Sequence, residues 1–238
     1  MPKSIVLVDG DVFVYRAAWA CNTDPLYEAI GVLDGILGAA VEAVLGYYDK
    51  SKVKIFLTGK GNFRYNYLKD YKGNRSDAPK PTHIADLRQH LIDVHKAVVS
   101  EGEEADDLIG INATSYSNRG YEVTVVSIDK DMLQIPCWHY NPVRDEWNKV
   151  SHLEGQRFFW KQMLTGDRVD NVQGVEGIGP VKAEKAIGEL ETEDEMFQAV
   201  LKLYDGDLER LTNTGIGLWL RREPNEIWSP PNANSNGS

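Results

Sequence analysis

Short apolar segments rich in β-branched residues alternate with longer segments of helical periodicity over the first 150 residues. Such alternation is typical of an α/β domain, because a helix connects each strand to a parallel neighbour. The predicted strands are 4–9, 53–58, 96–100 and 121–129, with a shorter one at 137–142. The predicted helices are 26–48, 81–95 and 105–118. The sequence therefore predicts an α/β fold with a mainly parallel sheet flanked by helices.

The last third of the chain differs, because no strand is predicted after residue 153. Helical segments separated by glycine-rich turns follow, and the chain ends in the polar sequence SPPNANSNGS, which cannot form a core. We predict an α/β core over 1–153, a helical region over 154–222 and a disordered tail over 223–238.

Composition excludes several classes of protein. No apolar run approaches the roughly 20 residues of a membrane span, and the first residues lead into a strand rather than a signal peptide. We expect a cytoplasmic protein with no membrane partner. Cys21 and Cys137 are far apart and the five histidines show no ligand spacing, so we predict neither a disulfide nor a His/Cys metal site.

The segment 58–82 interrupts the alternation with polar, aromatic and basic residues. The net charge of −10 argues against a nucleic-acid partner, but residues 50–80 contain nine basic side chains and two acidic ones. A connection this long is usually functional or mobile. Basic side chains interleaved with aromatic ones are typical of single-stranded nucleic-acid binding. We favour that interpretation of this basic arm over a solvated, lysine-rich loop.

Four acidic groups occur at positions where ligands bind in α/β proteins. Two of them follow predicted strands directly, and a third begins the helix after the strand at 96–100. In open α/β sheets the carboxyl ends of the strands form the ligand-binding crevice. One aspartate after a strand is an ordinary turn former, but four groups are not explained in that way. The groups are Asp9 with Asp11, residues 101–107, Asp129 with Asp131, and Asp167 with Asp170.

Seven or eight carboxylates in one crevice need a counter-charge, because like charges raise each other's pKa. An all-oxygen set without His or Cys is suited to Mg²⁺ or Mn²⁺. Since Mg²⁺ takes only one or two carboxylates directly, the number of carboxylates predicts more than one ion. Two ions about 3.5–4 Å apart can activate water and stabilise the leaving oxygen of a displacement at phosphorus.

A glycine-rich turn with the sequence NVQGVEGIGPVKAEKAI follows Asp170. Such a turn lets backbone N–H groups approach a phosphate closely, and the helix that Pro180 opens adds a favourable dipole. The alternative is a tight helix–helix turn. The lysines in the next helical turns favour binding to the duplex backbone without sequence readout. The residues concerned are Gly174, Gly177, Gly179, Lys182 and Lys185.

Five motifs in order resemble the 5′-nuclease or flap endonuclease superfamily, especially stand-alone bacteriophage 5′-3′ exonucleases and the 5′-nuclease domain of bacterial family A DNA polymerases. They are VDGDVFVYR, FRYNYLKDYKGNR, EADD, SIDKD and GDRVDNVQGVEGIGPVKA, between Val6 and about Leu190. The resemblance implies a PIN-like core, a helical arch over 58–82 that admits a 5′ single strand, and a helix-three-turn-helix that holds duplex. It implies a monomeric hydrolase of DNA with a free 5′ end or flap, possessing two Mg²⁺ or Mn²⁺ ions, a potassium site in the glycine turn and replication proteins as partners.

The resemblance also implies roles for individual residues. Lys72 and Arg75 would contact the scissile phosphate, Tyr71 would stack on a base, and Arg16 and Arg64 would bind DNA. The implied metal-site residues are Asp9, Glu104, Asp106, Asp107, Asp129, Asp131, Asp167 and Asp170.

The chain departs from the family pattern in one place. The family has an Asp just after the second strand, where this chain has Thr58 and Gly59. One acidic ligand is therefore missing, and a water held by the Thr58 hydroxyl is a candidate substitute. The missing Asp affects the expected occupancy of the second metal site, and with it the balance between exonuclease and flap cleavage.

Two other functions compete with this interpretation. A haloacid-dehalogenase-like phosphatase also has a strand followed by Asp-x-Asp, with Asp9 as nucleophile and Asp11 as general acid. It leaves the other acidic groups, the arm and the glycine turn unexplained. A DNA-structure-binding protein with weakened catalysis is the second alternative, and the missing Asp is its only support.

Overall fold

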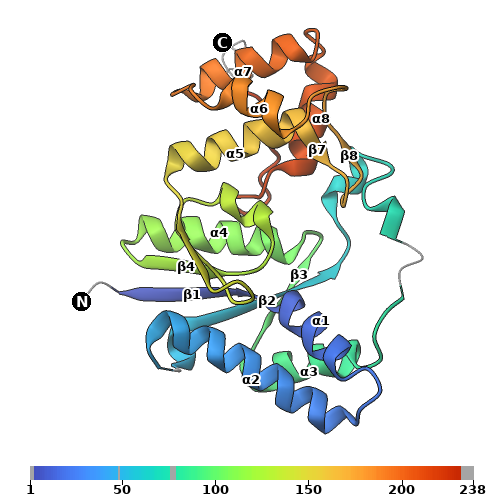
Figure 1. Cartoon of the computed structure of the whole chain (residues 1–238), viewed down its shortest axis with the longest axis vertical. Helices are drawn as coiled ribbons and strands as arrows, with labels where there is room; N and C mark the ends of the chain where they lie inside the picture. The colour runs from blue at the N-terminus through green and yellow to red at the C-terminus, as the bar shows by residue number, and fades with distance from the viewer. Residues whose placement is uncertain (1–2, 48, 76–78, 232–238) are drawn as a thin grey trace. The chain divides into compact units, whose positions relative to one another are not determined.

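The structure is a computed structural model that describes residues 3–47, 49–75 and 79–231 (Figure 1). By its internal contacts the chain forms two compact units, unit 1 (1–62 and 78–150) and unit 2 (63–77 and 151–238). The basic arm is thus divided, because 63–77 belongs to unit 2 rather than to the α/β core. Within the described residues, no helix is long and apolar enough to cross a membrane.

Unit 1 is built on a six-stranded sheet of order β3-β2-β1-β4-β5-β6. All neighbouring pairs are parallel except β5 with β6. The predicted α/β class with a mainly parallel sheet is therefore confirmed. The strands are β1 (Ser4–Asp9), β2 (Val53–Lys60), β3 (Val98–Glu101), β4 (Glu122–Val126), β5 (Trp138–Asn141) and β6 (Glu146–Lys149).

Helices cover both faces of this sheet (Figure 1). The helices of unit 1 are α1 (Gly10–Ala20), α2 (Leu26–Leu45), α3 (Ile84–His95) and α4 (Ala105–Asn118), with 3₁₀ turns η1 (Lys50–Lys52) and η4 (Lys130–Gln134). Val6 and Val8 of β1 are buried in one core with side chains of α1, α2 and α3. Successive strand residues point to opposite faces, and Ile5 and Leu7 are also buried, on the side where α4 packs on the sheet. Burial on both faces explains the continuous apolar sequence of β1.

One α-helix and one strand of unit 1 are absent from the sequence prediction. Helix α1 begins at Gly10, directly after β1, because the Asp9 side chain caps it by accepting from the Val12 N–H. A strand and a helix without a connecting loop give no turn signal between them. Strand β6 pairs with β5, but all four of its residues are exposed, so it lacks the apolar alternation that identifies a strand.

Unit 2 is mainly helical. Its elements are η2 (Phe63–Asn66), η3 (Gly73–Arg75), α5 (His152–Thr165), β7 (Gly166–Asp167), β8 (Val172–Gln173), α6 (Pro180–Ile187), α7 (Glu193–Leu203) and α8 (Leu208–Leu218). Capping boxes start α5 and α7, and Pro180 occupies the first turn of α6. The prediction that no strand follows residue 153 is wrong for β7 and β8. Each has only two residues, which is too short to show the apolar alternation that identifies a strand.

The core of unit 2 combines aliphatic side chains with a group of aromatic ones. Trp228 is buried and its ring lies 5.3 Å from that of Phe159 and 5.9 Å from that of Trp160. The packed chain therefore continues past residue 223, the predicted start of the tail. Residues 232–238 of that tail lie outside the described residues.

Candidate active site

Asp9 lies at the carboxyl end of β1, in the middle of the sheet of unit 1. Its side chain is buried, accepts a hydrogen bond of 2.9 Å from the Ser127 hydroxyl, and caps α1. Burial, together with the negative charges of Asp11 and Asp129, raises the pKa of Asp9 from 3.8 to about 7, although Ser127 opposes the shift. A carboxylate in this environment favours a nearby cation, which would remove the cost of its charge.

Ser127 connects Asp9 to the acidic pair that follows β4. Its hydroxyl oxygen accepts from the Asp129 N–H at 3.0 Å, and Asp129 in turn accepts from the Asp131 N–H at 2.9 Å. Asp129 is exposed and Asp131 is half-buried, so both present carboxylate surface at the sheet edge. The parallel pairing of β1 with β4 is what brings residues 118 positions apart together.

The third acidic group begins α4, as the sequence predicts. Glu104 is the N-cap residue, and it forms a capping box in which the Asp107 carboxylate accepts from the Glu104 N–H at 3.1 Å. Asp107 has no exposed surface, whereas Asp106 is half-buried. The side chains of Glu104 and Asp107 both cap the start of α4, but only Asp107 has no exposed surface, so Glu104 and Asp106 are the better candidates for an ion.

Thr58 and Gly59, at the position of the missing Asp, both have structural roles. The Thr58 hydroxyl accepts from the Ala105 N–H at 3.1 Å and so caps α4, which means that the proposed water would share this hydroxyl with a helix N–H. A Cβ atom at Gly59 would lie 1.9 Å from the carbonyl oxygen of Ser100, at a shift in the pairing of β2 with β3. No side chain fits at residue 59 unless β3 moves, so the sheet geometry excludes an Asp there.

Asp11 is not available in the way that the phosphatase alternative requires. It accepts from the Thr58 N–H at 2.7 Å and forms an ion pair with Arg88 of α3. Both carboxylate oxygens of Asp11 are therefore engaged by protein groups, the Thr58 N–H and the Arg88 guanidinium, rather than directed at a substrate. Arg88 was missed by the sequence analysis, because a single arginine on an amphipathic helix gives no signal.

The fourth acidic pair lies in unit 2, beside the segment 63–77. Asp167 is buried and caps the β7–β8 turn by accepting from the N–H groups of Val169 and Asp170. Asp170 accepts from the Tyr71 hydroxyl at 2.8 Å, and its carboxylate lies 3.6 Å from the Lys72 ammonium. The Lys72 N–H also donates to the Asp170 carbonyl at 2.9 Å. This cluster joins two predicted motifs that lie nearly 100 residues apart.

Two of the predicted DNA contacts need correction. Arg64 is 1% exposed, and its guanidinium donates to the carbonyl oxygens of Gly217 and Trp219 within unit 2. Tyr71 is 3% exposed and holds Asp170, so its ring is not offered to a base. In the sequence, Arg64 and Tyr71 look like members of an exposed basic and aromatic segment. Burial of an arginine against backbone carbonyls leaves no local pattern, so the sequence could not show that they are buried.

The remaining predicted DNA contacts lie on exposed or partly exposed positions. Arg16 is half-buried on α1, and Lys182 and Lys185 are exposed on α6. Arg75 ends η3, and its side chain lies outside the described residues.

The glycine turn before α6 has two kinds of glycine. Gly177 has φ +74° and open space around it, and Gly179 is the N-cap of α6. A Cβ at Gly174 would instead lie 2.3 Å from the Leu164 carbonyl oxygen, so Gly174 is required for packing. The Gly177 carbonyl accepts from the Lys182 ammonium at 2.8 Å, so this oxygen already contacts a cationic group.

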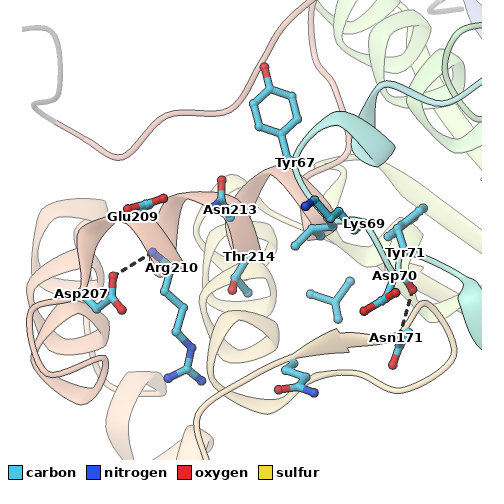
Figure 2. A pocket seen from close by; sticks show the side chains of 13 residues that line it. Tyr67, Lys69, Asp70, Tyr71, Asn171, Asp207, Glu209, Arg210, Asn213 and Thr214 are labelled. Carbon is cyan, nitrogen blue, oxygen red and sulfur yellow. Dashed lines mark hydrogen bonds between the residues drawn. The ribbon is translucent and has the colours of Figure 1, made fainter.

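Unit 2 also contains a pocket of about 450 Å³ between residues 67–71 and α8. Figure 2 shows Arg210 and Thr214 of α8 on one side and Tyr71 and Asp70 on the other. Arg210 donates to the Gly174 carbonyl at 2.6 Å and so connects α8 to the glycine turn. The lining mixes basic and acidic side chains, which is not typical of a phosphate pocket.

The parallel sheet with carboxylates at its central carboxyl edge belongs to the PIN-like class of folds. A flap endonuclease of bacteriophage T5, solved in a complex with DNA and metal ions, has this fold: the TM-score is 0.69 at 17% identity, over 91% of this chain and 89% of that one. The catalytic core of Rad2, solved with a DNA substrate, matches with a TM-score of 0.53 at 10% identity, over 96% of this chain and 84% of that one.

Sequence comparison identifies the family. The 5′-3′ exonuclease N-terminal resolvase-like domain matches residues 4–159. The 5′-3′ exonuclease of Buchnera aphidicola is 32% identical over 193 residues, which are 74% of this chain and 67% of that protein. DNA polymerase I of Bacillus subtilis is 28% identical over 229 residues, 83% of this chain but only 24% of the polymerase. The chain belongs to the 5′-3′ exonuclease family, which confirms the predicted resemblance and disfavours the phosphatase.

Proposed function

We propose that the protein is a structure-specific 5′ nuclease that hydrolyses DNA at a free 5′ end or flap with the help of divalent metal ions. The observation that carries this proposal is the environment of Asp9, a buried carboxylate among acidic neighbours at the edge of a PIN-like sheet. Its pKa of about 7 supports a cation as the missing partner.

The donor set of unit 1 fits Mg²⁺ or Mn²⁺. Every candidate ligand is a carboxylate oxygen, and hard divalent ions prefer such ligands. We assign ion binding to Asp9, Glu104, Asp106, Asp129 and Asp131, and the capping of α4 to Asp107. Two bound ions would supply an activated water and stabilise the leaving oxygen.

We assign to unit 2 two carboxylates of the cleavage reaction and several contacts with the DNA backbone. We assign Asp167 and Asp170 to the same cleavage reaction as the sheet-edge carboxylates. The Lys72 ammonium is half-buried and held near Asp170, so its position is set before a phosphate arrives. Arg75, Arg16, Lys182 and Lys185 would contact the DNA backbone, with the open Gly177 turn allowing close approach. A potassium site in this turn would use carbonyls other than that of Gly177.

One gel tests the proposal, with 5′-flap, nicked and blunt duplexes incubated with Mg²⁺ or with EDTA. We expect shortening from the 5′ end or release of the flap in Mg²⁺, and intact DNA in EDTA. Tight flap binding without Mg²⁺-dependent cleavage would instead indicate a DNA-structure-binding protein. Phosphate release from a small phosphomonoester, with all three DNAs intact, would indicate a phosphatase.

A further inference from the structure

A group of three potential metal ligands lies in unit 1 between α2 and α3. The Nε2 atoms of His90 and His95 each lie 2.9 Å from the same oxygen, Oδ1 of Asp34. Within the part of the chain that the structure describes, this is the only set of three His, Cys, Asp or Glu side chains whose ligand atoms all lie within 4.8 Å of one another. This grouping was missed by the sequence analysis, because residue 34 is distant in sequence from the two histidines.

The separations between these atoms match those around a transition metal. Metal–nitrogen and metal–oxygen bonds of about 2.0–2.2 Å, at angles between 90° and 110°, place neighbouring ligand atoms about 2.9–3.5 Å apart. Both imidazoles direct Nε2 to the same carboxylate oxygen, so the three ligand atoms already converge on one point. Two imidazoles and one carboxylate suit Zn²⁺, Co²⁺ or Ni²⁺ and disfavour Mg²⁺.

The helices fix the positions of the three side chains. Leu33 of α2 and Leu91 of α3 are fully buried in the same core, and each is adjacent in sequence to a member of the group. The side chains of His90 and His95 are 16% and 9% exposed, whereas that of Asp34 is 42% exposed. The group thus stands on a rigid base and opens to solvent on the aspartate side, which gives an ion access and leaves room for water ligands.

We propose that Asp34, His90 and His95 form a transition-metal site, separate from the sheet-edge carboxylates, that takes Zn²⁺ or a similar ion and links α2 to α3. Such a link stabilises α3, which also carries Arg88, the ion-pair partner of Asp11. We assign this ion a stabilising role rather than a catalytic one, because it would lie between two helices and not at the acidic sheet edge.

Metal counting tests this site directly. Metal-free protein is dialysed against Zn²⁺ with Mg²⁺ in large excess, so that Mg²⁺ occupies the oxygen sites, and bound zinc is measured. We expect one more zinc per chain in wild type than in His90→Gln/His95→Gln. The matched control is His83→Gln/His152→Gln, which changes two histidines outside the group and should bind zinc as wild type does.

Two further readouts keep the test decisive. Zinc at a hundredfold excess over its Kd should raise the melting temperature of wild type by roughly 5–10 °C and leave that of the double variant unchanged. Co²⁺ should give the visible absorption of an imidazole site in wild type only. Should the double variant not fold, Asp34→Asn, which keeps an acceptor for both rings, is expected to bind zinc at least tenfold more weakly. Equal zinc content and affinity in wild type and variants would overturn the proposal, and the group would be a hydrogen-bonded Asp-His-His cluster only.

Discussion

Asp9 is a buried carboxylate whose negative charge costs folding stability. Its folded-state pKa of about 7 lies above the ordinary 3.8, so between these values the folded protein keeps a proton that the unfolded chain has lost. The contribution of this group to stability is thus fully present below about pH 4 and is lost as the pH rises through 7. Above pH 7 the metal-free protein holds a buried, uncompensated charge.

We therefore predict that Asp9→Asn stabilises the metal-free protein at pH 8, by something on the order of 2 kcal/mol, and gives no stabilisation at pH 4. The amide still caps α1 and removes the charge. Urea unfolding at both pH values measures the effect, and exposed Asp86→Asn is the control. Mg²⁺ should stabilise wild type more than the variant. A variant less stable than wild type at pH 8 would contradict this account of Asp9.

Lys72, held near Asp170, is the residue of unit 2 that we propose to act on a phosphate. We expect Lys72→Ala to lower single-turnover cleavage of a 5′ flap about 10²–10³-fold with little change in affinity, the usual loss for one preorganised stabiliser of charge. Lys69→Ala is a matched control, because Lys69 is an exposed lysine of the same segment. Rates within about threefold of wild type for Lys72→Ala would mean that Lys72 plays no part in the chemistry.

At the scale of elements, the start of α4 depends on a side chain from β2. The Thr58 hydroxyl accepts from the Ala105 N–H, and α4 carries Asp106 and Asp107. We predict that Thr58→Val destabilises the protein by about 1–3 kcal/mol, because a helix N–H loses its partner. Thr58→Ser keeps the hydroxyl and should cost less. Urea midpoints compare the two, and equal losses would show that the methyl group, not the hydroxyl, matters.

The glycine turn before α6 is the element expected to grip duplex DNA. Gly177→Val would add bulk and strain at φ +74°, and should weaken binding to flap and plain duplex alike, with a shallower salt dependence. Gly46→Val imposes similar backbone strain at φ +73° at the end of α2, so it controls for stability alone. Loss of binding confined to particular sequences would argue against a backbone grip.

At the scale of the whole molecule, each unit carries part of the acidic set. We predict that Asp131→Asn in unit 1 and Asp170→Asn in unit 2 each lower cleavage by orders of magnitude while flap binding in Ca²⁺ persists. Carboxylates that hold ions, rather than DNA, would give this separation of cleavage from binding. Cleavage by the double variant at the wild-type rate would end the proposal of a shared metal-dependent reaction.

The sequence by itself determined the fold class, the family and the strand ends that carry the carboxylates. These follow from local patterns, since hydrophobic periodicity and motif order are readable along the chain. The start of α4 at Ala105 was readable too, from the acidic cap before it.

Only the tertiary structure decided what individual polar side chains do. The fold buries Arg64 against backbone carbonyls and places the Tyr71 hydroxyl in a hydrogen bond with Asp170. It leaves no space for a side chain at residue 59, and it places Asp34 within hydrogen-bond distance of His90 and His95. Each of these depends on contacts between residues far apart in the chain. Whether a polar group meets solvent, a carbonyl or another ligand is set by packing, which leaves no local pattern in the sequence.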